Sequence, residues 1–369
     1  MKKSVLFLIP TLGGGGAEKV LVNLANHLSQ EKYEVTVQTL FKGGVHERNL
    51  KSHVTLIEGK FNPFRGNVQF FKLFSPTFLY RRIVKKRYDI VVAFLEGVAC
   101  RIIAGCPFEN SKKLAWIHSA QRSIKTAKHS FRSPKEMNRL YNRFDNVVCV
   151  AETVKTDFES LVSMQKETLV LYNVNDTTAI VEQAKQPINA YDGVAVPKLI
   201  SVGRLIKVKG FDRLIRLHKR LMDEGMENRL YILGEGVLRE ELENQIKTLG
   251  VENSVSLLGF QSNPYPYVKN ADLFICSSIS EGFSTAVTES LVVGTPVVST
   301  NCSGAYELLG YNGEYGVVVE QDEEQLFTAV KRILTENGLL IKYKESAQER
   351  GKAFSTKETI LATEELLDS

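Results

Sequence analysis

The chain of 369 residues is 43% hydrophobic and 24% charged, which is typical of a soluble globular protein and long enough for two domains with separate cores. No run approaches the roughly 18 apolar residues that a helix needs to cross a bilayer. The net charge of +5 is uneven: residues 1–190 carry 28 Lys and Arg against 16 Asp and Glu, and the remainder carries 19 against 26, so we expect only the first half to meet an anionic partner.

The first half alternates strand-like and helix-like patterns. Val5 to Pro10 is a short apolar run, Ala17 to Ser29 has the apolar spacing of a helix, and Tyr33 to Leu40 alternates as a strand. Further buried runs follow at 54–57, 89–94, 114–117 and 147–150. Buried β-branched strands that alternate with helices are typical of a parallel, doubly wound sheet.

Two features bear on cellular location. The apolar run after Met1 is only about six residues long, so a buried first strand explains it as well as a signal peptide does. The cysteines are odd in number, form no CxxC pair and in several cases lie within strand-like runs (Cys100, Cys106, Cys149, Cys276 and Cys302). We therefore expect buried, reduced thiols in a cytosolic protein without a structural metal.

The alternation lapses over 176–197, where two prolines, a glycine and mixed polar residues predict an interdomain linker. It then restarts, with strands at 199–202, 229–233, 255–258, 273–276, 297–300 and 317–319 and helices at 211–224, 238–249, 322–337 and 356–367. The sequence therefore predicts an α/β fold with two successive doubly wound domains. In such sheets ligands bind at the carboxyl ends of the strands.

Several loops at those positions are unusual. Gly13 to Gly16 fits neither the dinucleotide pattern nor the P-loop, yet four glycines cost ordering entropy that a mere turn does not require, so we favour a ligand there. Arg204 and Lys209 flank a turn and could both reach a phosphate, or could be ordinary exposed cations. The turn at 234–236 is explained by the start of a helix alone, and an isolated histidine such as His118 is more often structural than catalytic.

The segment from Ser277 to Glu289 reads as a strand end, a loop and a helix start, with Ser284 or Thr285 as the N-cap. Glu281 and Glu289 would flank the free N–H groups of the helix, which attract anions. This arrangement could cradle a sugar, a diphosphate and a ribose. Two glutamates near a helix start are, however, usually solvated surface.

Together these motifs resemble the retaining GT-B glycosyltransferases of family 4 over nearly the whole chain. The most specific are Ser201-Val-Gly-Arg-Leu with Lys209-Gly210 and the E-x7-E pair of Glu281 and Glu289, while Gly13 to Glu18 matches a subgroup that builds bacterial surface polysaccharides. The resemblance implies two Rossmann-like domains with a cleft between them: an acceptor-binding domain over 1–180, on which a helix at 355–369 packs back, and a nucleotide-sugar-binding domain over 195–354. The segment 301–307 lacks the subgroup's Gly-Pro element, which leaves open which donor hydroxyls this loop reads.

The resemblance also implies roles for the site residues, with a UDP-sugar as donor and without a cofactor or a metal. Arg204 and Lys209 would neutralise the leaving diphosphate, Glu281 would bind the transferred sugar, and His118 would contact that sugar near the reacting carbon. These residues form the expected catalytic set. The expected donor-binding residues are Gly14, Gly15, Gly16, Gly203, Gly234, Glu235, Phe260, Gly282, Phe283, Ser284, Thr285 and Glu289, the last of them on the ribose.

The family transfers sugars with retention, and a front-face route in which the departing phosphate helps to deprotonate the acceptor is the usual proposal. It fits this chain, which shows no clear second catalytic carboxylate for a double displacement. The main catalytic effect would then be electrostatic stabilisation of the leaving diphosphate.

Two basic stretches of the first half predict the surface that binds the acceptor. Lys60–Tyr88 has no acidic residue and many aromatics, and Ser111–Arg143 has nine basic residues against a single glutamate. Cations beside aromatic side chains suit an anionic membrane face, although nucleic acid and an ordinary basic surface with its aromatics in the core compete with it. With the resemblance we favour a lipid-bound acceptor, and no nucleic acid.

The expected function is transfer of a hexose or N-acetylhexosamine from a UDP-sugar to a lipid-linked saccharide, with undecaprenyl diphosphate as the expected carrier. The product would belong to bacterial capsule, exopolysaccharide or cell-wall glycan synthesis, and the protein would work as a peripheral protein at the inner face of the plasma membrane. The alternatives are a non-catalytic GT-B partner subunit of another transferase and a GT-B nucleotide-sugar epimerase.

Overall fold

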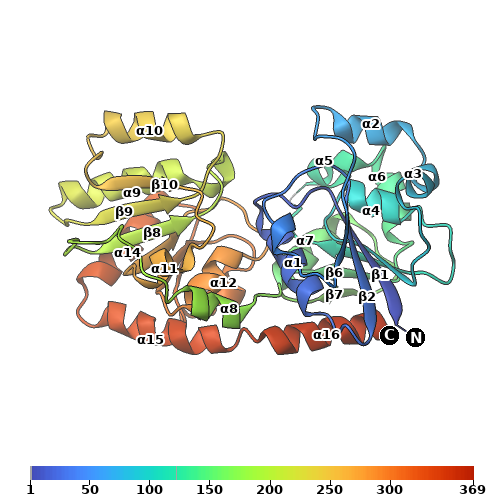
Figure 1. Cartoon of the computed structure of the whole chain (residues 1–369). Coiled ribbons are helices and arrows are strands. Elements are labelled where there is room, and N and C mark those ends of the chain that lie inside the picture. The colour runs from blue at the N-terminus through green and yellow to red at the C-terminus, as the bar shows by residue number, and fades with distance from the viewer. Residues whose placement is uncertain (1, 122) are drawn as a thin grey trace. The chain divides into compact units, whose positions relative to one another are not determined.

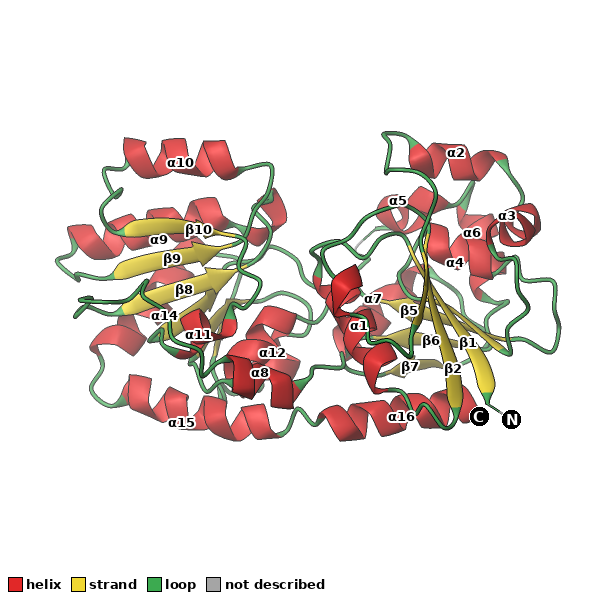
Figure 2. Ribbon diagram, in the orientation of Figure 1, coloured by secondary structure: helices red, strands yellow, loops and turns green. Residues whose placement is uncertain are grey.

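The computed structural model describes residues 2–121 and 123–369, which form two compact units (Figure 1). The first comprises Met1–Val174 and Lys357–Ser369, and the second comprises Asn175–Thr356. Each unit has a parallel sheet with helices on both faces (Figure 2). The predicted α/β class with two doubly wound domains is confirmed.

The sheet of the first unit has the strand order β3-β2-β1-β4-β5-β6-β7, and all of its paired strands are parallel. Its strands are β1 (Lys3–Ile9), β2 (Tyr33–Thr39), β3 (Thr55–Ile57), β4 (Ile90–Ala93), β5 (Lys112–Ile117), β6 (Asn146–Cys149) and β7 (Thr168–Val170). Its helices are α1 (Gly16–His27), α2 (Asn67–Leu73), α3 (Pro76–Ile83), α4 (Val98–Ile103), α5 (Ile124–Ala127), α6 (Pro134–Tyr141), α7 (Glu152–Leu161) and α16 (Thr356–Asp368), with 3-10 turns η1 (Glu47–Asn49) and η2 (Lys128–Ser130). Strands β1 and β4 are buried almost throughout, because helices cover both of their faces.

The sheet of the second unit has the order β10-β9-β8-β11-β12-β13, again parallel. Its strands are β8 (Lys198–Val202), β9 (Arg229–Leu233), β10 (Val255–Gly259), β11 (Leu273–Cys276), β12 (Val297–Thr300) and β13 (Val317–Val319). Its helices are α8 (Thr177–Gln183), α9 (Phe211–Asp223), α10 (Arg239–Thr248), α11 (Tyr265–Lys269), α12 (Thr285–Val292), α13 (Ala305–Leu309), α14 (Glu323–Thr335) and α15 (Leu339–Lys352), with the 3-10 turn η3 (Lys207–Lys209). Residues of α9, α10 and α14 share one hydrophobic core with the central strands.

The C-terminal helix α16 is part of the first unit. Lys3 Nζ lies 3.0 Å from Asp368 Oδ1, and Lys32 Nζ lies 2.9 Å from Glu364 Oε2. The Tyr33 hydroxyl donates to the Glu364 carbonyl at 3.2 Å. These contacts attach the last helix to the start of the chain, so the polypeptide crosses between the units twice.

The structure differs from the sequence-based expectation at the unit boundary. The linker expected over 176–197 begins with α8, whose N-cap Asp176 accepts a hydrogen bond from the Ala179 N–H, and this segment belongs to the second unit. The helix α15 and the short strand β7 were also not predicted. All five cysteines are buried free thiols, as expected. Of the helices within residues 2–121 and 123–369, none combines the length and the hydropathy that crossing a bilayer requires.

Candidate active site

The order of the second sheet places two loops side by side. Strands β8 and β11 are neighbours, and the chain winds away from them in opposite directions. In doubly wound sheets the loops after such a pair diverge and leave room for a ligand at the carboxyl edge. Lys209 follows β8 and Glu281 follows β11, so the topology brings two of the predicted residues to this point.

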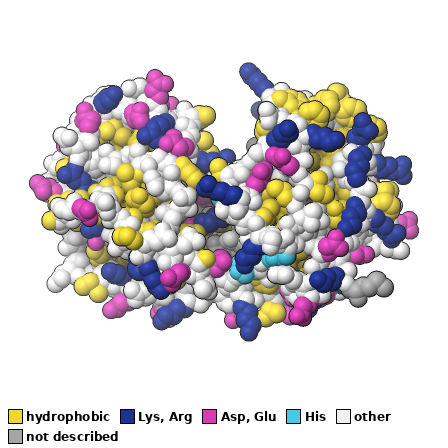
Figure 3. All heavy atoms as spheres, viewed as in Figure 1, with side chains coloured by type: hydrophobic (Ala, Val, Ile, Leu, Met, Phe, Trp, Pro, Cys, Tyr) yellow, Lys and Arg dark blue, Asp and Glu magenta, His cyan; other side chains and the backbone are white. Residues whose placement is uncertain are grey.

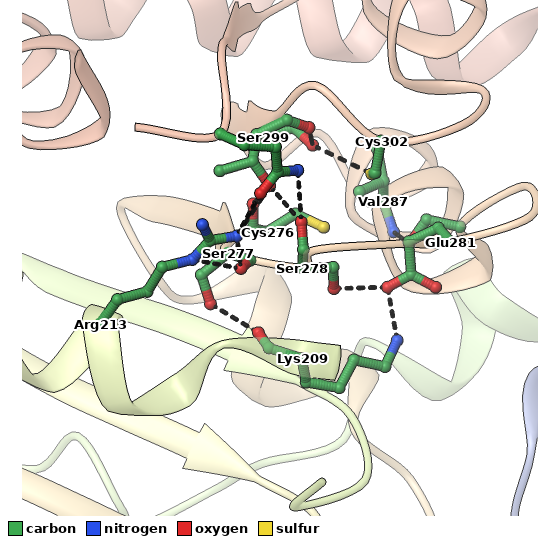
Figure 4. A network of polar contacts seen from close by, with 12 residues as sticks. Lys209, Arg213, Cys276, Ser277, Ser278, Glu281, Val287, Ser299 and Cys302 are labelled. Atoms are coloured by element: carbon green, nitrogen blue, oxygen red, sulfur yellow. Dashed lines mark hydrogen bonds and ion pairs between the residues drawn. The ribbon is translucent and has the colours of Figure 1, made fainter. Parts of the chain in front are cut away.

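Lys209 and Glu281 form an ion pair in the second unit (Figure 4). The Lys209 Nζ lies 2.6 Å from Glu281 Oε1, and the Ser278 hydroxyl donates to the same oxygen at 2.5 Å. The two charged side chains are 20% and 13% exposed. Burial disfavours the charged amine, yet the carboxylate of Glu281 outweighs it and raises the pKa of Lys209, which therefore stays protonated.

Backbone contacts hold these two loops together. The Ile279 N–H donates to the Val208 carbonyl at 2.7 Å, and the Ser277 hydroxyl donates to the Lys209 carbonyl at 2.9 Å. Gly210 has a φ of +63°, and a Cβ there would lie 2.3 Å from the Ser277 carbonyl oxygen. Only glycine satisfies both conditions, so the close approach of the loop after β11 already requires glycine at position 210.

A buried arginine that the sequence analysis missed, Arg213, holds the start of the Glu281 loop at Ser277 (Figure 4). Arg213, on α9, donates from Nε to the Ser277 carbonyl at 2.7 Å and from Nη2 to Gln321 Oε1 at 3.0 Å. The Thr300 hydroxyl and Gln321 Nε2 in turn donate to the Ser278 carbonyl at 2.6 and 3.0 Å. This network satisfies the carbonyl groups at the end of β11, where the strand no longer has a neighbour.

The helix after this loop begins as predicted, with Ser284 as the N-cap of α12. Its hydroxyl accepts from the Val287 N–H at 3.4 Å. Phe283 and Ser284 are buried, Thr285 is partly exposed, and Glu289 is only 6% exposed. Glu289 thus lies within the unit rather than on its surface, which excludes the solvated-glutamate interpretation for this residue.

The loops after β8 and β9 approach each other closely. Gly234 has a φ of +141°, and a Cβ there would lie 1.9 Å from the Gly203 carbonyl oxygen. A Cβ on Gly236 would lie 2.4 Å from the Leu205 carbonyl oxygen. Chain packing therefore already demands glycine at 234 and 236, which the sequence pattern could not separate from a ligand requirement.

Three predicted site residues of the second unit are exposed to solvent. Arg204 is exposed, Phe260 is 49% exposed, and the Glu235 carboxylate accepts a hydrogen bond from Arg239 Nη1 at 2.7 Å. Arg204 and Lys209 thus differ: the lysine is paired with Glu281 and the arginine reaches solvent. Across the described residues, His, Cys, Asp and Glu form no group of three or more that could hold a metal ion.

In the first unit, the glycine-rich loop follows β1 and leads into α1, which begins at Gly16. Gly13, Gly14 and Gly15 all have negative φ. The nearest atom to a Cβ on Gly14 would be Val45 Cγ2 at 3.8 Å, an ordinary contact, and Gly14 and Gly16 are exposed. Unlike Gly234, Gly14 is required neither by backbone conformation nor by local crowding.

His118 lies at the carboxyl end of β5 and is 8% exposed. Its ring packs against Phe94 with a centroid separation of 4.6 Å. Burial lowers its pKa to about 3, so the imidazole is neutral near pH 7. Glu96, which the sequence analysis did not single out, accepts a hydrogen bond from the His118 backbone N–H at 2.9 Å, and its position right after the buried strand β4 was the signal that could have identified it.

Comparisons with known proteins agree with this architecture. Residues 14–178 match the family described as Glycosyltransferase Family 4, and residues 192–352 match Glycosyl transferases group 1. One relative is the N-acetylgalactosamine-N,N'-diacetylbacillosaminyl-diphospho-undecaprenol 4-alpha-N-acetylgalactosaminyltransferase of Campylobacter jejuni, which is 32% identical over 361 residues and 96% of each chain. Another is the lipopolysaccharide core biosynthesis glycosyltransferase LpsE of Rhizobium meliloti, which is 25% identical over 91% of this chain and 90% of LpsE.

Solved structures share the fold. HepE from Anabaena in complex with UDP superimposes with a TM-score of 0.77 at 22% identity and covers 100% of both chains. The sucrose-phosphate synthase from Thermosynechococcus elongatus gives a TM-score of 0.80 at 17% identity over 100% of this chain and 98% of that one. With a relative above 30% identity along almost its entire length, this chain belongs to the family 4 glycosyltransferases and has the GT-B fold.

Proposed function

We propose that this protein transfers a hexose or N-acetylhexosamine from a UDP-sugar to a saccharide carried on undecaprenyl diphosphate, with retention of the anomeric configuration and without a metal. The observation that supports binding of the UDP-sugar donor is the ion pair of Lys209 with Glu281 at the switch point of the second sheet. The acceptor half rests on the Campylobacter jejuni relative, whose name states an undecaprenol-linked substrate. HepE, which shares the fold, has been solved with UDP and with UDP-glucose.

The geometry suggests how the donor would bind. Lys209 supplies a fixed positive charge at the carboxyl edge, and the incoming diphosphate would take over part of its interaction with Glu281. Glu281, held by Ser278 as well, is then free to accept hydrogen bonds from hydroxyls of the sugar. The capped start of α12 adds N–H groups that favour the negative charge that develops on the departing diphosphate. Arg204 would reach the same diphosphate from its exposed position.

The first unit offers an accessible backbone and a neutral imidazole. The glycine-rich loop has room for a phosphate at Gly14, where no neighbour fills the space that a side chain would occupy, whereas the space at Gly15 is taken by the Glu18 carboxylate. His118 would contact the transferred sugar. Its neutral ring can accept or donate a hydrogen bond without adding a positive charge.

An aromatic and basic surface on the first unit supports a membrane-bound acceptor. Phe64, Phe70, Phe74 and Phe78 follow one another with ring centroids 6.0, 5.3 and 5.2 Å apart. Figure 3 shows hydrophobic side chains gathered over α2 and α3 with Lys and Arg among them. The most exposed apolar side chains of this surface are Phe61 (71%), Phe64 (45%), Phe70 (47%), Leu73 (73%) and Phe78 (50%). Phenylalanines this exposed beside cations are typical of a surface that contacts anionic lipid.

The same surface is rigidly supported. The buried Arg101 donates to the Phe71 and Phe74 carbonyls at 2.9 and 2.8 Å and pairs with Glu136 at 3.2 Å. Arg132 donates to the Lys72 and Leu73 carbonyls at 2.7 and 3.0 Å. Two arginines thus hold the end of α2, with Phe71 buried, while Phe70 and Leu73 of the same helix remain exposed. Part of the predicted basic stretch 111–143 also has a structural role, as these contacts of Arg132 show.

The enzymatic proposal is tested with a panel of UDP-sugars and undecaprenyl-diphosphate-linked saccharides, with detection of UDP and of the extended glycolipid. We expect one donor to give both products, an unchanged rate in EDTA, and the α-configuration by NMR from an α-linked donor. If no UDP-sugar yields UDP with any such acceptor, the chain is better explained as a non-catalytic partner subunit.

The membrane surface is tested separately by sedimentation with vesicles of phosphatidylglycerol and phosphatidylcholine. Replacing Phe61, Phe70 and Phe78 with Ser should abolish sedimentation. The matched control replaces three similarly exposed apolar residues of the second unit, Val237, Tyr311 and Ile341, and should bind as the unaltered protein does. Absence of binding at low salt by the unaltered protein would contradict the membrane proposal.

A further inference from the structure

Glu96 occupies a distinctive place in the first unit. In the sheet order, β1 and β4 are neighbours from which the chain winds in opposite directions, and Glu96 follows β4 at this switch point. Its Oε2 accepts from the His118 backbone N–H at 2.9 Å, and its Oε1 accepts from the Ser119 hydroxyl. Gln121 Nε2 donates to the same hydroxyl at 3.0 Å. One carboxylate therefore binds two consecutive residues of the loop after β5.

The ring of His118 depends on this loop for its position. Among the residues that the structure describes, its buried Nε2 has no hydrogen-bond partner, and its packing neighbour is the ring of Phe94. An apolar ring fixes the plane of an imidazole only in part, so the backbone on which His118 stands determines where Nε2 points. That backbone is held by the hydrogen bond to Glu96.

We propose that Glu96 is a positioning residue for the transfer reaction, which acts by fixing the loop that presents His118 to the substrate. The inference rests on the proposed function, since it takes His118 to contact the transferred sugar. Glu96 itself need not touch the substrate. Both of its oxygens are engaged with the His118–Ser119 segment, which is the arrangement that sets the orientation of a neighbouring group.

A purely structural role for Glu96 explains the site less well. Burial raises the pKa of Glu96, which means that an ionised carboxylate at this position lowers the stability of the fold relative to a neutral side chain. The helix that follows does not require it, because the N-cap of α4 is Gly97 and not Glu96. What the carboxylate provides is two strong acceptors aimed at adjacent residues, and this serves the geometry of the loop.

The test is a double-mutant cycle between Glu96→Ala and His118→Ala, read as turnover and KM for the donor. We expect Glu96→Ala to lower turnover by roughly ten- to a hundredfold, since displacing a substrate-contacting group by about 1 Å costs on that order. In the His118→Ala background the same change should have almost no further effect. Glu96→Gln should keep turnover within a few-fold, because its amide oxygen can accept from the His118 N–H while its NH2 donates to the Ser119 oxygen.

The controls separate the outcomes. Glu109→Ala, an exposed glutamate before the start of β5, should leave turnover unchanged. Melting temperatures of all variants show whether a loss reflects unfolding. If Glu96→Ala lowers turnover equally with and without His118, or if Glu96→Gln is as impaired as Glu96→Ala, the positioning role is overturned while the proposed function stands. If the unaltered protein releases no UDP from any UDP-sugar, the proposed function fails, and this inference fails with it.

Discussion

Lys209→Ala perturbs the centre of the candidate site, and its effect on stability can be worked out from the structure. The change removes an ammonium 2.6 Å from the Glu281 carboxylate, which is 13% exposed in the intact pair, and the Ser278 hydroxyl still donates to that carboxylate. Breaking a fully buried ion pair costs about 3–5 kcal/mol, and an exposed pair contributes about 0–1 kcal/mol. The intermediate burial places the loss in free energy of unfolding at about 2 kcal/mol.

The double variant Lys209→Ala/Glu281→Gln separates stability from catalysis. Glutamine removes the uncompensated negative charge, so the double variant should recover about 1 kcal/mol relative to Lys209→Ala. Turnover should fall by on the order of a hundredfold in Lys209→Ala, because one stabilising charge is lost from the transition state, and it should not recover in the double variant. Glu281→Gln alone should weaken transfer more than it weakens the binding of UDP.

The assay combines urea unfolding with measurement of UDP release. Far-UV circular dichroism follows the whole chain, while fluorescence of the single tryptophan, Trp116 on β5, serves as a reference for the first unit. Lys207→Ala, an exposed lysine on the same turn, is the matched control and should change neither quantity appreciably. Near-normal turnover in Lys209→Ala would refute the diphosphate role, and a double variant no more stable than Lys209→Ala would refute the charge argument.

Three further predictions concern the framework of the site. Arg213→Ala should lower the free energy of unfolding by about 2–3 kcal/mol, because it leaves the buried Ser277 carbonyl without the hydrogen bonds that Arg213 donates, and it should also lower turnover. Arg216→Ala on the exposed face of the same helix should cost less than about 1 kcal/mol in urea unfolding. Gly234→Ala should destabilise the protein well beyond Gly250→Ala, because both positions have positive φ but only the first meets a backbone oxygen at 1.9 Å; equal melting temperatures would contradict this. Burial lowers the pKa of His46, His118 and His218 from 6.5 to about 4, 3 and 4, so below pH 6.5 these three side chains bind fewer protons in the folded state than in the unfolded state. Their contribution should lower the urea midpoint as pH drops from 7 towards 5, and a flat profile would contradict this.

Local sequence patterns predicted much of the fold and part of the candidate site. Runs such as 273–276 are strands because β-branched and apolar residues between turn signals have few other stable arrangements. Ser284 was recognisable as an N-cap candidate because its hydroxyl suits a helix start. The spacing from Glu281 to Glu289 follows from the sequence alone. The expected linker at 176–197 contains the helix α8, which local patterns did not predict because it is stabilised by packing against α11 and α12.

The sequence by itself determined the alternation of strands and helices in both units, apart from elements such as α8, α15 and β7, and the loops in which Lys209 and Glu281 lie, because hydrophobic period and turn chemistry act over a few residues. Only the tertiary structure decided that these two side chains form an ion pair across 72 positions of the chain. It also showed that Arg213 lies beneath the Glu281 loop and that Glu96 holds the backbone of His118. Such partners come together through the winding order of parallel strands, and no local pattern encodes which strand ends become neighbours.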